Sequence, residues 1–217
     1  MNTEQMAQEM RRRLNRPDED DLFEFPLSYH GFLSQAHRHF YKLTAQHSPG
    51  FLYATDTLTS SDGGATFTLT DDHFGELLLY RSPGPPRGQP LVPAIPEGAG
   101  HYWQEGRTLN FIAAYPDTLY IRWIPATITA LDQDNDSVLP SYYDDAIIEW
   151  ACFLAGQTPG FLGNPDVFKQ NALREWRGEQ DNPGDMGILG IISRQSAYQA
   201  WEGQTDVSQA WWRGLGN

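Results

Sequence analysis

Residues 138–178 constrain the fold of this 217-residue chain more than any other stretch of its sequence. They read VLPSYYDDAIIEWACFLAGQTPGFLGNPDVFKQNALREWRG. Apolar residues recur at helical spacing on both sides of a glycine-containing turn, which predicts one helix over 141–155 and another over 165–177. No catalytic motif accompanies the pair. The pattern therefore favours a unit built for packing and assembly rather than an active site.

Residues that begin and end helices flank both patterns. Ser141 with Asp144 three residues later resembles a capping box, although aspartate replaces the usual glutamate. Asn164 and Pro165 suit the N-cap and the first turn of the second helix. Gly178 suits its end, because glycine adopts the backbone conformation that closes a helix.

Two further helices are predicted near the N-terminus, over 3–15 and over 28–46. The first has a narrow apolar stripe, and the second starts at a plausible N-cap, Ser28. The stripe of the first helix contains Met6, Met10 and Leu14. The apolar face of the second helix contains Tyr29, Phe32, Leu33, Ala36, Phe40 and Leu43. Arg11, Arg12 and Arg13 end the first helix, where cations suit the helix dipole. An acidic run over 18–21 follows at once, which favours a local or intersubunit ion pair over a nucleic-acid patch.

The pattern changes between about residues 51 and 130, where short runs alternate with a period of two or are rich in strand formers. These runs are Thr66–Thr70, Glu76–Arg81, Thr108–Phe111 and Thr118–Ile124. Asp62-Gly63-Gly64 is a turn signal between them. Residues 82–100 are dense in proline and glycine and predict a long loop, of the kind that is functional or orders against a neighbour. The fold class predicted is α+β, a bundle of about four helices with a β-rich insertion and an extended C-terminal arm.

The chain carries 28 acidic residues against 15 lysines and arginines, for a formal net charge of −13. Such a chain is poorly suited to binding nucleic acid by releasing counterions from its phosphates. The charge keeps a protein soluble, and it would also suit the wall of a conduit through which nucleic acid slides without sticking. Both interpretations stay open on composition alone.

The single cysteine, Cys152, excludes an internal disulfide bond and lies among apolar residues at a helical position. We therefore predict a buried, unreactive thiol. The N-terminal residues lack the apolar core of a secretory signal, and the sequence has no run of 18 apolar residues. We expect the protein to fold in a reducing cytosol.

Asp132-x-Asp134-x-Asp136 imitates the start of an EF-hand calcium loop. Ser137 stands where that loop requires glycine, and Tyr143 where it requires a bidentate glutamate, so we interpret the triplet as a polar turn. The six histidines lack ligand spacing, and nucleotide-binding and hydrolase motifs are absent from the sequence. We predict no catalytic residue, no cofactor and no metal, and a protein that is not an enzyme.

The C-terminal stretch 179–217 is rich in glycine and polar residues, yet it contains three tryptophans. Exposed aromatic residues on an extended arm are costly unless a partner buries them. We therefore predict two parts, a core over 1–178 and a docking arm over 179–217. The predicted partner-binding residues are Ile191, Ile192, Tyr198, Trp201, Trp211, Trp212 and Arg213.

The order of elements resembles the head-to-tail adaptor (connector) proteins of tailed bacteriophages, over roughly residues 5–178. The resemblance rests on helices followed by strands, on Phe111-Ile112-Ala113-Ala114-Tyr115-Pro116 and Tyr120-Ile121-Arg122-Trp123-Ile124-Pro125, and on a loose signature from Leu139-Pro140 to Trp150-Ala151. The last helix of the resemblance starts with Asn164-Pro165-Asp166.

The resemblance implies a structural protein of the virion neck that forms a ring, typically of about twelve copies, beneath the portal. The ring would contact the portal and a tail or tail-completion protein, and it would extend the DNA channel without sequence-specific binding. It implies production in the host cytoplasm, no membrane, and a role in genome ejection. The alternatives are a tail-completion or terminator protein of the same particle, and a β-rich ligand- or carbohydrate-binding module with Tyr102, Trp103 and Trp123 as stacking residues. Of these three, Trp123 lies in an alternating strand, which favours a core position.

Overall fold

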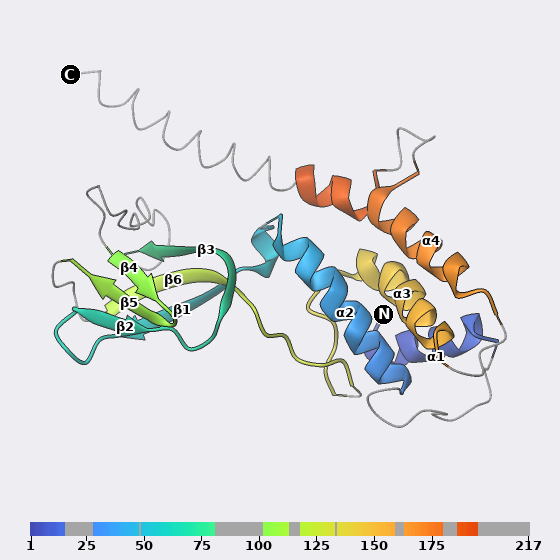
Figure 1. Cartoon of the computed structure of the whole chain (residues 1–217), viewed down its shortest axis with the longest axis horizontal. Helices are drawn as coiled ribbons and strands as arrows, with labels where there is room; N and C mark the ends of the chain where they lie inside the picture. Colours follow the sequence, from blue (N-terminus) through green and yellow to red (C-terminus); the bar gives the residue numbers. More distant parts are fainter. Residues whose placement is uncertain are drawn as a thin grey trace, which may run out of the picture. The chain divides into compact units, whose positions relative to one another are not determined.

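The computed structural model describes residues 1–15, 28–47, 49–80, 102–112, 118–132, 134–158, 163–179 and 186–194. The chain divides into two compact units, coloured by sequence in Figure 1. Unit 1 comprises Met1–Gly50 and Thr129–Asn217, and unit 2 comprises Phe51–Ile128. Unit 2 is therefore an insertion within the sequence of unit 1. The α+β prediction is confirmed, because the described α-helices belong to unit 1 and antiparallel strands form unit 2.

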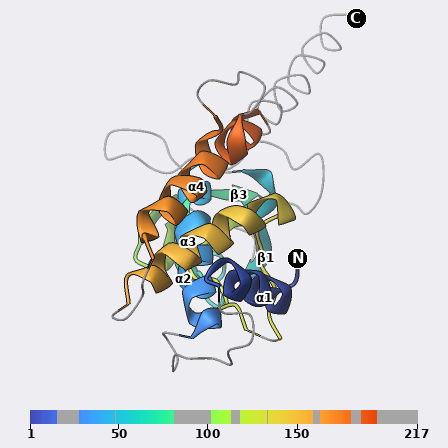
Figure 2. The ribbon, with the colours of Figure 1, turned by 90° about the vertical axis from the view of Figure 1, so that its right-hand side faces the viewer.

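The helices of unit 1 pack around one central helix, α3. Its helical elements are α1 (Thr3–Arg13), α2 (Tyr29–Ala45), the 3₁₀ turn η2 (Ser141–Tyr143), α3 (Asp144–Gly156) and α4 (Pro165–Arg177), and residues 187–194 are also helical. α3 contacts α1, α2 and α4, as the end-on view of Figure 2 shows. A helix surrounded in this way must be apolar on most sides. Six α3 residues are fully or almost fully buried: Ala146, Ile147, Ile148, Ala151, Cys152 and Ala155.

The predicted apolar stripes of unit 1 lie inside, with minor exceptions. Met6, Met10 and Leu14 are buried, and so are all residues of the predicted α2 face except Leu43, which is partly exposed. Aromatic contacts join α2 to α3 and α4. The Phe40 ring centroid lies 5.8 Å from that of Trp176, and the His39 ring stacks on Trp150 at 4.2 Å.

Two of the predicted N-caps are confirmed and one is wrong. Ser28 accepts a hydrogen bond from the Gly31 amide (3.0 Å), and Asn164 accepts one from the Asp166 amide (3.1 Å). The capping box at Ser141 does not form, because that residue starts the 3₁₀ turn and α3 begins at Asp144 without a side-chain cap. The Leu139-Pro140 corner thus leads into α3 through η2.

Unit 2 consists of two three-stranded antiparallel sheets. Its strands are β1 (Ala54–Thr59), β2 (Thr66–Thr68), β3 (His73–Tyr80), β4 (Tyr102–Glu105), β5 (Thr108–Phe111) and β6 (Thr118–Pro125), preceded by a 3₁₀ turn, η1 (Gly50–Leu52). The strand orders are β1-β6-β3 and β2-β5-β4. The predicted loop over 82–100 lies outside the described residues.

One apolar core serves both sheets of unit 2. It includes Leu79 and Ile121 from one sheet and Phe67 and Leu109 from the other. The predicted turn at Asp62 passes between the sheets, since β1 and β2 belong to different sheets. The Asp62 carboxylate accepts hydrogen bonds from the Ala65 amide (3.1 Å) and the Thr66 amide (3.0 Å). These bonds stabilise the connection between the two sheets.

His37 of α2 is only 1 % exposed, and neither ring nitrogen has a hydrogen-bond partner in the described part of the chain. Burial, with a smaller contribution from Arg38, lowers the pKa of His37 to about 4, from 6.5. Below pH 6.5 the unfolded chain therefore binds more protons than the folded chain, and acid favours unfolding.

We expect wild-type stability to fall by about 3 kcal/mol between pH 6.5 and pH 4 through this residue. The variant His37→Leu should lose that contribution, and above pH 7 it should differ from wild type by a constant offset. Urea unfolding at a series of pH values measures both. Parallel pH profiles for the two proteins would contradict the assignment.

Candidate functional site

Residues 187–194 form the last described helical segment, and they contain two of the predicted partner-binding residues. Ile188 and Ile192, one turn apart, are buried, whereas Ile191 is 39 % exposed. Ile192 is thus part of the chain's interior, while Ile191 offers an apolar side chain to solvent. The other predicted partner-binding residues lie outside the described residues: Tyr198, Trp201, Trp211, Trp212 and Arg213.

A close backbone approach at Gly187 holds this segment against the end of α4. Gly187 has a φ of +55°. A Cβ atom added there would lie 2.2 Å from the Gly178 nitrogen and 2.6 Å from the Arg177 carbonyl carbon. Gly178 itself closes α4 as predicted, with a φ of 81°. Only glycine fits at Gly187, both for its conformation and for the space available.

The variant Gly187→Ala is expected to lower the free energy of unfolding by about 2–4 kcal/mol, from backbone overlap and left-handed strain together. Gly106→Ala is the matched control, because Gly106 has a φ of +60° and open space around its missing Cβ. That control should cost about 1–2 kcal/mol. If Gly187→Ala and Gly106→Ala lowered the free energy of chemical unfolding equally, the backbone at Gly187 would not be packed tightly against the end of α4.

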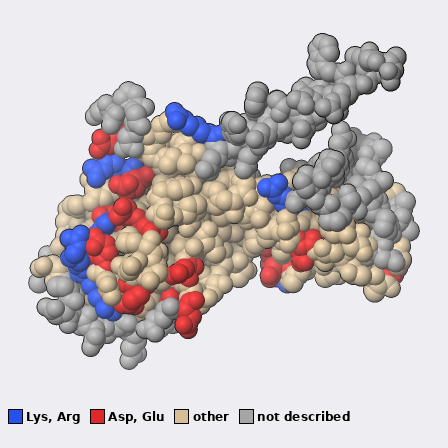
Figure 3. Space-filling model, turned by 180° about the vertical axis from the view of Figure 1, so that it is seen from behind, with Lys and Arg blue, Asp and Glu red and all other residues tan. Residues whose placement is uncertain are grey.

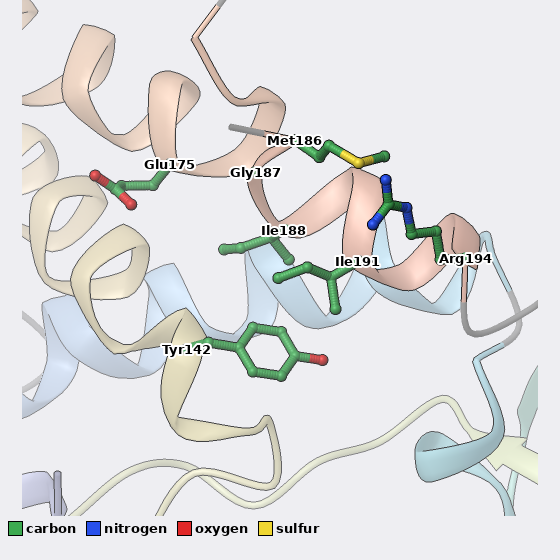
Figure 4. A pocket seen from close by; sticks show the side chains of 7 residues that line it. All are labelled: Tyr142, Glu175, Met186, Gly187, Ile188, Ile191 and Arg194. Atoms are coloured by element: carbon green, nitrogen blue, oxygen red, sulfur yellow. The ribbon is translucent and has the colours of Figure 1, made fainter. Parts of the chain in front are cut away.

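The segment borders a surface hollow of about 350 Å³ in unit 1. Figure 4 shows Ile188 and Ile191 extending toward the ring of Tyr142, with Glu175 at one end and Arg194 at the other. Tyr142 is 37 % exposed, and Ile191 is exposed to a similar degree. Met186 and Gly187 complete the lining. The hollow therefore combines an apolar floor with one charge of each sign at its ends.

Arg13 pairs with three carboxylates, one on its own helix α1 and two on α3. Its guanidinium lies 2.9 Å from Glu9, 2.5 Å from Asp145 and 2.6 Å from Glu149. The Arg13 side chain is 19 % exposed and that of Glu149 is 12 % exposed, so this pair is largely shielded from solvent, whereas the Asp145 side chain is 60 % exposed. Hydrogen bonds from Arg12 and Arg13 lower the pKa of Glu9 to about 2. The cluster fastens α1 onto α3.

The other two arginines of this run are also engaged within the chain. Arg12 pairs with Glu9 at 2.6 Å, and the Arg11 guanidinium lies 4.9 Å above the Tyr29 ring. Arg12 and Arg13 thus form ion pairs within the chain, with carboxylates of α1 and α3. Pairing with the acidic run that follows the arginines stays a prediction. On the face shown in Figure 3, basic and acidic side chains lie side by side. The acidic run over 18–21 lies outside the described residues.

The acidic triplet at 132–136 has a structural role. Asp132 accepts hydrogen bonds from the Asp134 and Asn135 amides, both at 2.9 Å, and thereby forms the predicted polar turn. Asp136 accepts a hydrogen bond from the Thr3 amide (2.9 Å), which anchors the start of α1. Within the described ranges, no group of three or more His, Cys, Asp or Glu residues could hold a metal ion.

The comparison with protein families decides what kind of molecule carries these surfaces. The family model described as SU10 adaptor protein matches residues 1–207. The chain belongs to the SU10 adaptor protein family. The match extends beyond the stretch 5–178 that carries the resemblance, and it includes Tyr198 and Trp201. The predicted class, a structural bacteriophage protein of the head-to-tail adaptor kind, is confirmed. No curated protein matches the sequence significantly.

The thiol of this adaptor is unsuited to nucleophilic chemistry. Cys152 is fully buried, and burial raises its pKa well above the usual range, with the Glu149 carboxylate adding to the shift. Its sulfur lies 3.9 Å from the Met10 carbonyl oxygen. The prediction of a buried thiol is confirmed. Among the described helices, none combines the length and apolar character that crossing a membrane requires.

Unit 2 of the adaptor exposes one of the three aromatic residues considered for ligand stacking. Trp123 and Tyr102 are buried in the core, whereas Trp103 on β4 is 42 % exposed. Stacking by Trp123 and Tyr102 is therefore excluded. A smaller hollow of about 130 Å³ in the same unit is lined mostly by polar residues, among which Arg107 pairs with Asp72 at 2.8 Å.

Proposed function

We propose that this adaptor forms a homo-oligomeric ring that joins the capsid portal to the tail and extends the channel through which DNA passes. The observation that carries the proposal is the family match over residues 1–207. We expect about twelve copies in a closed ring, in which each copy contacts two neighbours through two different faces. The ring is a component of the virion neck, is made in the host cytoplasm, and has no enzymatic role.

The electrostatics of the chain support a conduit for DNA rather than a DNA-binding surface. The net charge is −13. The densest positive run, Arg11 to Arg13, is used for contacts within unit 1. DNA phosphates bind chiefly through lysine and arginine side chains that can release counterions. A chain with this excess of acidic over basic residues lets DNA slide past without retaining it.

The C-terminal residues support docking to the portal or to a neighbouring subunit. Tyr198, Trp201, Trp211, Trp212 and Arg213 are of residue types that dominate binding energy at interfaces, and Ile191 adds an exposed apolar side chain before them. Ile192 supports the fold from within. The boundary between core and arm at residue 178 remains a prediction. Because residues 188 and 192 are buried, a deletion that spares the fold has to start after residue 194.

Native mass spectrometry, with and without portal protein, tests the proposal. We expect a monomer or weak oligomer alone, and a complex with about twelve copies when portal is present. Deletion of residues 195–217 should preserve the far-UV circular dichroism spectrum and abolish the complex. An adaptor that remains monomeric beside assembled portal would refute the ring. A deletion variant that docks normally would show that the arm has another purpose.

A further inference from the structure

We infer that the hollow between Tyr142 and residues 187–194 receives the Trp211-Trp212 pair of a second copy of this chain. The inference rests on the proposed ring and names the contact that links its neighbouring copies. It concerns a surface within unit 1, and every lining residue of that surface is described.

The chemistry of the hollow suits an indole side chain. Tyr142 and Ile191 present an aromatic ring and a branched aliphatic chain, each more than a third exposed. Burying an aromatic side chain against such a floor removes a large apolar area from water. Arg194 at one end can stack its guanidinium on the face of an indole ring.

The size of the hollow also fits one or two side chains. Its volume of about 350 Å³ lies at the lower end of the range for sites that enclose small organic groups. Its floor is fixed rather than soft, because the buried Ile188 and the close approach at Gly187 hold the helical segment in place. A fixed floor lowers the entropy cost of binding.

The course of the chain points to its own C-terminal segment as the occupant. The described chain ends at Arg194, which is itself a wall of the hollow, and 23 further residues follow up to Asn217. Trp211 is 17 positions beyond Arg194, so fully extended chain could span about 55–60 Å between them. That reach is sufficient for a neighbouring copy.

The geometry of a ring favours a neighbour over the same copy. A segment that leaves one wall of a hollow and enters the hollow of the next copy makes a head-to-tail contact, and such contacts are all satisfied when the ring closes. Each copy then contributes one arm and one hollow. Once copies gather on a portal, the arm of a neighbour is present at high effective concentration, which multiplies a weak single contact.

Cysteine cross-linking tests the inference, because the native Cys152 is buried and leaves a low thiol background. Full-length Arg194→Cys and Arg213→Cys copies are mixed, assembled on portal protein and oxidised. Both substitutions retain Tyr142, Ile191 and all tryptophans. We expect a disulfide-linked heterodimer on a non-reducing gel. Val167→Cys, at an exposed site on α4 that does not line the hollow, replaces Arg194→Cys in the control and should give little heterodimer.

A chain that carries both Arg194→Cys and Arg213→Cys distinguishes an arm that enters a neighbouring copy from an arm that folds back onto its own copy. We expect ladders of linked copies, and an intrachain product alone would overturn the inference. Rings that assemble without the heterodimer would overturn it while leaving the proposed function intact. Absence of rings by native mass spectrometry would refute the proposed function and, with it, the contact between ring neighbours.

Ile191→Glu gives an independent readout in the otherwise native chain. A carboxylate on the apolar floor should reduce the amount of assembled ring at least tenfold, whereas Val167→Glu should leave it within about twofold. Circular dichroism confirms that both variants are folded. Equal assembly by the two variants would overturn the inference.

Discussion

Replacement of Trp176 by alanine is expected to lower the free energy of unfolding of unit 1 by about 3–5 kcal/mol. Trp176 is buried where α4 meets α2 and η2. Its ring centroid lies 5.8 Å from that of Phe40 and 6.4 Å from that of Tyr143. The lost stability has two parts: the transfer free energy of a large apolar side chain, and the cost of the cavity that it leaves. The cavity remains because helices that are held on several sides cannot collapse into it.

Urea unfolding followed by far-UV circular dichroism measures this loss, since the helical signal comes from unit 1. Trp176→Phe retains a ring at the site and should cost less than about 1.5 kcal/mol. Val167→Ala, at an exposed position of the same helix, should cost less than about 0.5 kcal/mol. If Trp176→Ala were no worse than Val167→Ala, α4 would not be part of the core.

The second large effect concerns Arg13. Replacing it with methionine is expected to cost about 3–5 kcal/mol, because the mostly buried Glu149 would lose its main ion-pair partner. Arg12→Met is the matched control: Arg12 is the preceding residue, also pairs with Glu9, and is 70 % exposed. An exposed pair contributes about 0–1 kcal/mol. The double variant Arg13→Met/Glu149→Met should regain most of the loss, since the unpaired carboxylate that remains, Asp145, is 60 % exposed to water.

The pH dependence supplies a further check on the Arg13 cluster. The pKa of Glu9 is lowered to about 2 from 4.5, first by the hydrogen bond from Arg12 and then by that from Arg13. A lowered carboxyl pKa contributes stability above pH 4.5 that is lost as the pH falls toward 2. The difference between wild type and Arg13→Met should therefore shrink over that interval. Equal destabilisation by Arg12→Met and Arg13→Met would indicate a general charge effect instead.

The apolar stripes of the helices were predictable because burial of one side of a helix requires apolar residues at a regular spacing in the sequence. Met6, Met10 and Phe40 follow that period and are buried. The strands β1 and β4 lack a comparable apolar pattern in the sequence. β1 reads ATDTLT and buries only Leu58, so its alternation is hidden, and β4 directly follows the proline- and glycine-rich stretch.

The candidate site was only partly predictable. Ile191 and Ile192 look equivalent as neighbours in an apolar run, yet successive residues of a helix point about 100° apart, and only one of the two is exposed. The spacing of Ile188 and Ile192 was the available signal that one side faces the interior. The hollow itself was not predictable, because Tyr142 and Glu175 reach it from helical elements whose packing no local pattern specifies.

The way unit 2 is inserted bears on how such adaptors can diversify. Its first and last strands, β1 and β6, are paired with Ala54 opposite Trp123, so the polypeptide enters and leaves the unit on adjacent strands. An insert with neighbouring ends can be lengthened, trimmed or exchanged without pulling apart the segments that it interrupts. A change in the length or sequence of unit 2 is therefore expected to leave the helical packing of unit 1 in place.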